Sequence, residues 1–386
     1  MKTLKGPAAL QRRGDRLPRW GRLLLVLAFL YLFLIGVGLL EGGIRAFGEG
    51  FNEGLLESVR NPLAGLFAGI AATVVVQSSS ITTSTIVGLV GSGTMPVELA
   101  VPMIMGANIG TTVTNTLASL ASIRRAEEFR RAFSAATMHD FFNIIGVVVL
   151  LPLELATGVL EKSARRLAGY LGRSGIGGAE AESPFRTAVK AGVGMVEGAV
   201  QAVAGVTGPA LGVALLVVGV ALLFVSLRLV TTNMRKVLAG RVERAMNQVL
   251  NTGGGLAGMV IGAVITVLVM SSSITTSILV PMVAAGVLTT RTAYPITLGA
   301  NIGTTATALI ASLAVVEPGG LQIALVHLLF NVAAIALVYP LPAVRFIPVR
   351  LSETLADHAV ERRSLVAAYI AVVFVALPFL GVFLLA

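Results

Sequence analysis

The chain has 386 residues, of which 55% are hydrophobic and only 12% are charged. Its mean hydropathy is +0.89, and a soluble protein of this composition would expose large apolar patches and aggregate. The sequence therefore indicates an integral membrane protein, because runs such as 23–40 and 211–227 are long enough to cross the hydrocarbon core of a bilayer.

The formal net charge is +10, but the basic residues lie in short breaks between apolar runs. Membrane topology explains this distribution better than nucleic-acid binding does. The basic residues before the first apolar run are Lys2, Lys5, Arg12, Arg13, Arg16, Arg19 and Arg22. By the positive-inside rule, the segment 1–22 lies in the cytoplasm.

The run 23–40 continues into Glu41 and Gly42 without a small-residue cleavage site, so we expect a retained helix rather than a signal peptide. The chain has no cysteine, which excludes disulfides and thiolate metal sites. We expect an all-helical protein with a first transmembrane repeat at 23–160 and a second at 191–386. The segment 161–190, rich in glycine and charge, is predicted to be the loop between them.

A polar sequence occurs twice along the chain. QSSSITTS, which begins at Gln77, returns as MSSSITTS at Met270, and MGANIGTT from Met105 returns as LGANIGTT from Leu298. The two copies of each segment are separated by the same number of residues. The sequence therefore contains an internal duplication of a polar site and not only of apolar filler.

The segment around each triple serine is too polar and too rich in glycine and threonine for a continuous spanning helix. We predict a re-entrant helical hairpin with the serines at its tip, facing a binding site, because irregular backbone at membrane depth is tolerated only in protein or beside a wet cavity. The GANIGTT element is predicted to be a broken transmembrane helix. Its glycines weaken the helix and allow close backbone approach, and Pro102 and Pro295 interrupt it at matched positions. Matching interruptions in two halves indicate the site of a transporter.

The chemistry of this site must be uncharged, since no Lys, Arg, Asp or Glu occurs within 61–97 or 245–290. Hydroxyl groups and main-chain N–H groups at helix ends bind phosphate-like oxyanions in other proteins. We therefore expect a small, oxygen-rich anion. Its expected ligands are Gln77, Ser78, Ser79, Ser80, Ser271, Ser272 and Ser273.

An anion buried without a cationic side chain needs another source of positive charge. Co-bound cations would supply it, because hard cations such as Na⁺ take amide, hydroxyl and carbonyl oxygens as ligands. The expected cation ligands are Asn108, Thr111, Thr112, Thr114, Asn301, Thr304, Thr305 and Thr307. The residues alone thus suggest a cation-coupled anion symporter.

At these residues the sequence resembles the type II sodium-dependent phosphate cotransporters. The similarity includes the QSSS hairpin and the segments 104–116, 128–152, 294–308 and 321–342, and it extends roughly from residue 23 to the C-terminus. It implies two inverted repeats whose triple-serine hairpins meet near the midplane, bind phosphate and move it with Na⁺ by alternating access. It also implies that Gln77 is a Na⁺ ligand.

Two features depart from the family pattern. Met270 stands where the second repeat of the family has glutamine, and a thioether is a poor sodium ligand. The stretch 87–95 carries no acid, whereas electrogenic members use an intramembrane aspartate for an additional sodium. Together these departures favour two Na⁺ per divalent phosphate.

Two other functions remain open. Another small oxyanion or a carboxylate, carried with Na⁺ or H⁺, would use similar chemistry, although the lack of a basic residue favours a small anion over a dicarboxylate. A membrane enzyme acting on a phosphorylated lipid would use GANIGTT as a phosphate cradle, but the core segments lack a nucleophile, a base or metal-binding carboxylates at suitable spacing. We therefore expect no enzyme and no cofactor, with Na⁺ as the coupling ion.

The expected setting is the plasma (inner) membrane, crossed several times. The partners would be inorganic phosphate, sodium ions and the lipid bilayer, and no nucleic acid. A homodimer is compatible with this interpretation, since an apolar surface suits lipid and a partner helix equally.

Several polar residues also have a purely structural interpretation. The serine triplets could bond back to their own helices, and GANIGTT could serve a tight helix crossing. His139 and Asn143 recur as His327 and Asn331, each pair on one helix face. A proton site is one interpretation of these pairs, and ties between neighbouring helices are the favoured one.

Asp140 has no counterpart in the second half, where Leu328 takes its place. We expect Asp140 near the membrane interface beside Arg130 and Arg131. An ion pair and a role in transport are equally open for this carboxylate.

Overall fold

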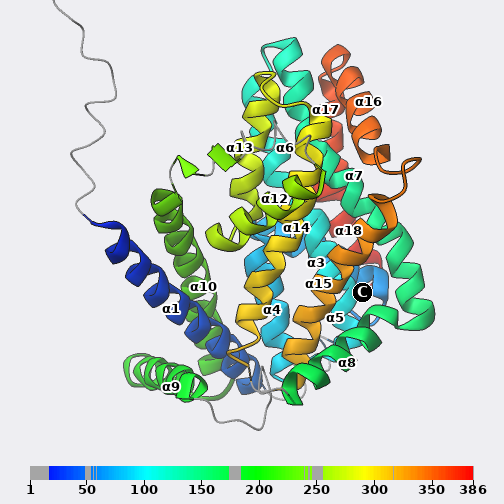
Figure 1. Ribbon diagram of the computed structural model, residues 1–386. Coiled ribbons are helices and arrows are strands. Elements are labelled where there is room, and N and C mark those ends of the chain that lie inside the picture. Colours follow the sequence, from blue (N-terminus) through cyan, green and yellow to red (C-terminus); the bar gives the residue numbers. More distant parts are fainter. Residues whose placement is uncertain are drawn as a thin grey trace, which may run out of the picture.

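The computed structural model describes residues 17–47, 54, 56, 57, 59–173, 184–238, 240, 241, 244, 245, 255–315 and 317–385, and every regular element in this part of the chain is helical (Figure 1). The basic N-terminal segment 1–22 is therefore described only from residue 17 onward. All-helical structure, as expected, is confirmed for the described residues.

The helices fall into two series in chain order. The first series comprises α1 (Arg19–Ala46), α3 (Pro62–Val76), α4 (Ser79–Gly91), α5 (Val97–Gly110), α6 (Val113–Ser119), the short η2 (Leu120–Ser122), α7 (Ala126–Thr157) and α8 (Val159–Arg173). The second comprises α9 (Pro184–Ala204), α10 (Gly208–Leu238), α12 (Gly255–Val269), α13 (Ser272–Ala284), α14 (Thr290–Ala311), α15 (Pro318–Val338), α16 (Ile347–Glu361), α17 (Ser364–Ile370), the π-helical η3 (Ala371–Ala376) and α18 (Leu377–Leu385).

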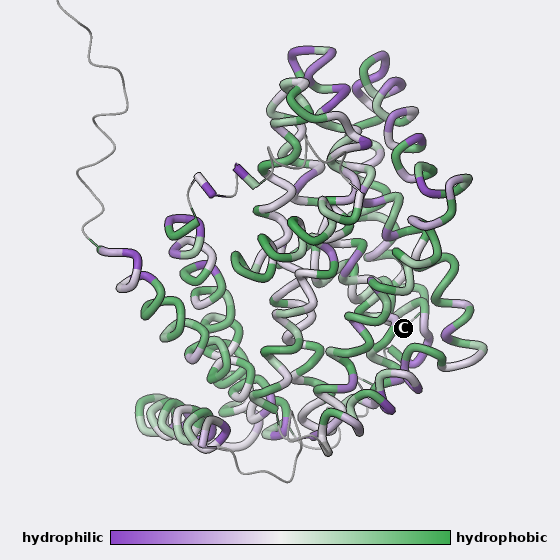
Figure 2. Tube along the Cα trace, viewed as in Figure 1, coloured by the Kyte–Doolittle hydropathy of each residue, from purple (hydrophilic) through white to green (hydrophobic). Residues whose placement is uncertain are grey.

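Five stretches of helix among the described residues are long and apolar enough to cross a membrane: 19–46, 126–157, 208–238, 318–338 and 364–385. Figure 2 shows these helices as hydrophobic along most of their length. Large apolar side chains such as Leu27, Phe224 and Phe383 are exposed on them. Such a surface suits lipid, which agrees with an integral membrane protein.

Two pairs of shorter apolar helices, α3–α4 and α12–α13, contain the triple serines. At 15 and 13 residues each, these helices are about 20–22 Å long, shorter than the roughly 30 Å hydrocarbon core. Two residues join each pair, and Gln77 (φ 55°) and Met270 (φ 57°) are the only described non-glycine residues in a left-handed conformation. The duplicated sequence thus forms the same tight turn twice, at a cost of about 1–2 kcal/mol each.

Each hairpin packs against the GANIGTT helix that follows it, α3 against α5 and α12 against α14. Both crossings require glycine. A Cβ added to Gly106 would overlap the carbonyl oxygen of Leu66, and one added to Gly299 would overlap that of Met259. Gly110 and Gly303 are similarly close to the backbone of α3 and α12. The close backbone approach expected at these glycines is confirmed.

The broken helix is present in one half only. In the first half, α5 ends at Gly110 and α6 begins at Val113, whereas α14 continues through the matched residues from Thr290 to Ala311. The expected break in the second repeat is therefore wrong. Ala306 and Ala308 stand there in place of Val113 and Asn115, and alanine has the highest helix propensity, so the helix continues.

The segment 161–190 is not the loop that we expected. Helix α8 occupies it up to Arg173 and α9 from Pro184 onward, while residues 174–183 lie outside the described part. In α8, Leu160 and Ala164 are buried on one face, and Glu161 and Arg165 form an ion pair one turn apart. An amphipathic pattern of this kind forms a surface helix despite its glycines and charges.

Candidate functional site

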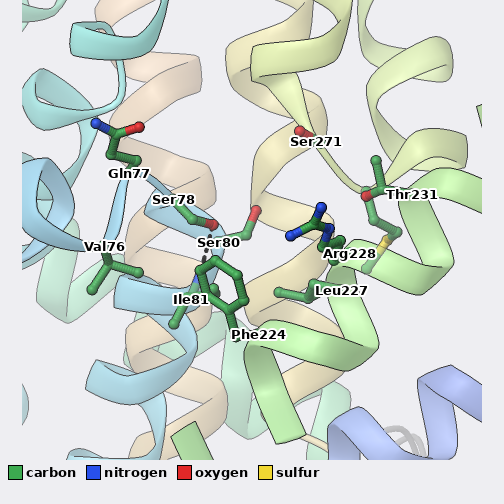
Figure 3. A pocket seen from close by; sticks show the side chains of 11 residues that line it. Val76, Gln77, Ser78, Ser80, Ile81, Phe224, Leu227, Arg228, Thr231 and Ser271 are labelled. Carbon is green, nitrogen blue, oxygen red and sulfur yellow. Dashed lines mark hydrogen bonds between the residues drawn. The ribbon is translucent and has the colours of Figure 1, made fainter. Parts of the chain in front are cut away.

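A cavity of about 300 Å³ lies between the two matched turns (Figure 3). It is lined from the first turn by Val76, Gln77, Ser78, Ser80 and Ile81, from the second by Met270 and Ser271, and from α10 by Phe224, Leu227, Arg228 and Thr231. The structure therefore brings together two segments that the sequence separates by nearly half of the chain.

The turns present the N-terminal ends of α4 and α13 to this cavity. Ser78 caps α4, since its Oγ accepts a hydrogen bond from the N–H of Ile81 at 3.4 Å. Ser271 precedes α13 but its side chain makes no such capping bond. Figure 3 shows the hydroxyls of Ser80 and Ser271 on either side of the cavity. Helix N-termini and hydroxyl groups together favour an anion.

Arg228 gives the cavity a positive charge that we did not expect. Its guanidinium extends from α10 into the space between Ser80 and Ser271 (Figure 3). The expectation of an uncharged site is therefore wrong, because it considered only the charges near the duplicated segments. The spacing of Phe224, Arg228 and Thr231 places all three on one face of α10. An arginine within a long apolar helix is itself a sequence sign of a functional site, and it could have identified Arg228.

Not all of the predicted anion ligands line the cavity. Gln77, Ser78, Ser80 and Ser271 do, whereas the side chains of Ser79, Ser272 and Ser273 are not among its lining residues. The last three lie in the first turns of α4 and α13, and Ser79 and Ser272 are buried there. A helical turn directs successive side chains in different directions, so only part of each triplet can face one cavity.

The predicted cation ligands Asn108 and Asn301 belong to a buried hydrogen-bond network between the halves. Nδ2 of Asn301 donates to Oδ1 of Asn143 at 2.7 Å, and Nδ2 of Asn143 donates to the carbonyl oxygen of Asn108 at 2.7 Å. Nε2 of His139 lies 2.9 Å from Oδ1 of Asn301. His139 and Asn143 thus tie neighbouring helices together, as the favoured interpretation predicted.

The predicted threonine ligands are all buried or nearly so. Four of their hydroxyls donate to backbone carbonyl oxygens three or four residues earlier in the chain: Thr111, Thr112, Thr304 and Thr305. By contrast, the hydroxyls of Thr114 and Thr307, which occupy matched positions, are buried without a hydrogen-bond partner. An unsatisfied buried hydroxyl costs about 1–3 kcal/mol. These two hydroxyls could therefore bind a ligand without breaking an existing hydrogen bond.

Asp140 does not lie beside the arginines at the interface. Arg130 pairs with Asp357, so the expected position of Asp140 beside these arginines is wrong, and so is the ion pair that was one of its two open interpretations. Asp140 is fully buried, and Tyr369 donates a hydrogen bond to its Oδ2 at 2.6 Å. Hydrogen bonds from Thr116 of α6 and Tyr369 of α17 direct the carboxylate towards these two helices.

Residues 32–167 and 222–381 match a family described as Na⁺/Pi-cotransporter. Sodium-dependent phosphate transport protein 2A of Oryctolagus cuniculus is 35% identical over 428 residues, covering 92% of this chain and 66% of that protein. Sodium-dependent phosphate transport protein 2B of Homo sapiens is 33% identical over 448 residues, covering 93% of this chain and 64% of that protein.

The chain therefore spans about 64–66% of the length of these relatives. No solved structure is significantly similar to this one. The family match covers both halves of the chain, including both triple-serine turns and both GANIGTT helices. The chain belongs to the Na⁺/Pi-cotransporter family, a family of transporters and not of enzymes.

Proposed function

We propose that this protein transports inorganic phosphate across the plasma membrane together with Na⁺, by alternating access. The observation that carries the proposal is the cavity between the two matched turns, which joins hydroxyl groups, two helix N-termini and one guanidinium. The family to which the chain belongs and the names of its relatives support the same substrate and coupling ion.

Phosphate would bind with its oxygens towards Ser78, Ser80 and Ser271 and towards the N-termini of α4 and α13. Arg228 would form charge-assisted hydrogen bonds to it, and the planar guanidinium suits phosphate oxygens in a paired arrangement. A single arginine offsets only part of the charge of a divalent phosphate. The remaining negative charge gives co-bound Na⁺ its electrostatic role.

Na⁺ would bind where uncharged oxygens are available at the site. Gln77 offers an amide oxygen at the cavity, and the unpaired hydroxyls of Thr114 and Thr307 lie in the two GANIGTT helices. Met270 occupies the turn position that matches Gln77, and its thioether is a poor sodium ligand. The two halves would therefore contribute unequally to cation binding.

The proposed architecture is an inverted repeat with two re-entrant hairpins. Since α3–α4 and α12–α13 are too short to cross, each hairpin would return to its own side, and α1, α5–α6 and α7 would make an odd number of crossings. The packing of α1 against α10 supports this arrangement. Gly36 approaches Gly219 and Gly43 approaches Gly212, so these two matched helices run antiparallel.

The inversion is also supported by contacts that exchange between the halves. Helix α4 of the first half packs against α15 of the second, and α13 of the second half packs against α7 of the first. Such reciprocal packing is expected when two similar halves face each other across a pseudo-two-fold axis in the membrane plane. Relative movement of the halves would then expose the cavity to one side at a time.

The experiment that tests this function is uptake of radiolabelled phosphate into proteoliposomes with an imposed Na⁺ gradient. Parallel reactions replace Na⁺ by K⁺, or impose a proton gradient, or offer sulfate and succinate as competitors. Accumulation that requires Na⁺ and is reduced only by unlabelled phosphate is the expected result. Accumulation driven by protons, or suppressed by sulfate or succinate, would contradict the proposal and indicate a symporter of another oxyanion or a carboxylate, or one coupled to H⁺.

A further inference from the structure

A second hollow, of about 570 Å³, lies along α10 beside the cavity between the two turns. The residues that line it all belong to this helix and are all apolar: Leu216, Val217, Val220, Ala221, Phe224 and Val225. Phe224 also lines the cavity between the turns, so one side chain borders both spaces. We call the second space the α10 groove.

The groove and the cavity follow each other along one face of α10. In a helix of 3.6 residues per turn, Val220, Phe224 and Thr231 point in nearly the same direction. Figure 3 shows Phe224 on the side of α10 that faces the first turn. Gly212 and Gly219 lie on another face, where α1 packs closely. The groove and the cavity therefore form one surface, which the packing of α1 leaves exposed.

The polarity of this surface changes at Arg228. The residues 208–227 of α10 include no Asp, Glu, Lys or Arg, whereas the rest of the helix carries Arg228, Arg235 and Lys236. The groove extends over about 12 Å of the helix axis and leads to the guanidinium, the serine hydroxyls and the helix N-termini of the cavity. An apolar segment followed by an anion site is complementary to an anionic amphiphile.

A phosphate monoester with one alkyl chain fits both parts of this surface. Its three free oxygens can accept hydrogen bonds from Arg228 and from the hydroxyls of Ser80 and Ser271, as inorganic phosphate would. Its fourth oxygen carries the chain, which would pass Phe224 into the groove. A phosphate diester has one free oxygen fewer, and its second chain exceeds a groove lined by one helix face. A cationic amphiphile would be repelled by Arg228.

The direction of the surface agrees with the orientation of a lipid. Arg235 and Lys236 lie in the last turn of α10, and basic residues at the end of a spanning helix favour the cytoplasmic side. A lipid of that leaflet has its head group towards this end and its chain towards the middle of the bilayer. Arg228 and the groove follow each other in the same order.

We propose that the cavity also accepts a membrane-dissolved phosphate monoester with a single alkyl chain, in competition with inorganic phosphate. Its phosphate lies against Arg228, and its chain lies in the α10 groove. The competition rests on the proposed function, because it requires inorganic phosphate in the same cavity. Binding of the amphiphile does not, because it depends only on Arg228, the serine hydroxyls and the groove.

Photo-crosslinking of the purified full-length protein in nanodiscs tests the proposal. The probe is decyl phosphate with a diazirine on its chain, and mass spectrometry identifies the labelled residues. A matched probe has the same chain and a trimethylammonium head group. We expect the phosphate probe to label 216–225 roughly 10- to 100-fold more strongly than the cationic probe, because charge-assisted hydrogen bonds hold its head group. Arg228→Gln should remove this difference.

A variant in the groove separates the chain from the head group. Val217→Trp fills the groove with a large ring, and Val217 does not line the cavity. We expect it to weaken labelling by the phosphate probe about tenfold and to leave uptake of inorganic phosphate unchanged. The matched control is Val148→Trp on α7, since Val148 is 66% exposed and Val217 is 63% exposed. If Val217→Trp does not fold, the labelling pattern of the wild type still decides.

Inorganic phosphate with Na⁺ should reduce labelling of 216–225 by the phosphate probe. Equal labelling by both probes would indicate ordinary lipid contact and overturn the proposal. A crosslinked dimer in which 216–225 are shielded from both probes would overturn it in favour of a second copy of the chain. Labelling that persists in phosphate, in a wild type that transports phosphate, would overturn the shared cavity. Labelling that requires Arg228 in a protein without phosphate uptake would reject the proposed function and retain the amphiphile site.

Discussion

Arg228 determines the electrostatic character of the cavity. Serine hydroxyls and helix N-termini attract an anion, but their partial charges offset only part of a phosphate charge. The guanidinium adds a full charge from a separate helix, opposite the hydroxyls of Ser80 and Ser271. Because Arg228 lies on α10, it would connect a bound phosphate to a long apolar helix of the second half.

Replacement of Arg228 should therefore weaken phosphate binding. Hydrogen bonds to charged groups contribute about 1.5–3 kcal/mol, so Arg228→Gln should raise the phosphate concentration for half-maximal uptake by roughly 10- to 100-fold. Arg228→Lys keeps the charge without the paired donors, so its phosphate concentration for half-maximal uptake should lie between those of the wild type and Arg228→Gln. Arg235→Gln, in the exposed last turn of the same helix, is the matched control. Equal half-saturation in Arg228→Gln and Arg235→Gln would contradict this role.

At the scale of elements, the two hairpins are held by crossings that leave no room for a side chain. The matched glycines of α5 and α14 contact carbonyl oxygens of α3 and α12, and backbone atoms cannot move aside as a flexible side chain can. Close crossings of this kind are how membrane helices associate tightly. They fix the positions of the turns at Gln77 and Met270 and hence the shape of the cavity.

Substitution at these crossings should be strongly destabilising. We expect Gly106→Ala or Gly299→Ala to lower the stability by about 1–3 kcal/mol or more, seen as a lower midpoint of thermal unfolding in detergent. Gly194→Ala is the control, because a Cβ at that position in α9 would meet nothing within 4 Å. There the midpoint should stay constant or rise slightly. A Gly299→Ala protein as stable as Gly194→Ala would refute the backbone contact.

The elements also indicate which features a sequence can predict. The duplication predicted the matched turns and glycine crossings, because both depend on local residue types at fixed spacing. A broken helix was predicted in both halves, with Pro102 and Pro295 as the interruptions, but both prolines lie inside continuous helices. The break occurs only in the first half, at Thr111–Thr112, since small differences in propensity at Val113 and Asn115 decide it. Arg228 was missed because its role depends on tertiary contact between α10 and both turns, which linear order does not contain.

At the scale of the whole molecule, arginine side chains tie helix ends to neighbouring elements at both ends of the protein. Helix α16 packs on the start of α7, where Arg130 pairs with Asp357. At the other end of the molecule, Arg165 of α8 pairs with Glu98 at the start of α5, and Arg45 at the end of α1 bonds to Ser92. Figure 1 shows α8 and α16 at opposite ends. In the proposed topology, α16 is cytoplasmic and α8 is external.

Labelling of single cysteines tests this topology, and the natural chain contains no cysteine to interfere. Tyr170 on α8 is 70% exposed. We expect the cysteine of Tyr170→Cys to react with a membrane-impermeant maleimide in intact cells. Thr354→Cys on α16, also exposed, should react only after permeabilisation. Labelling of both from the same side would contradict the inverted arrangement.

The most direct test of the central claim, that phosphate and Na⁺ bind together between the two turns, is ligand protection of a cysteine in the cavity. Thr231→Cys places a thiol on the cavity wall, and Thr354→Cys serves as the matched control away from it. Phosphate in the presence of Na⁺ should slow modification of Cys at 231 by a charged thiosulfonate reagent at least tenfold, and phosphate in K⁺ should not. Equal modification rates at position 231 with and without phosphate in Na⁺ would contradict the account.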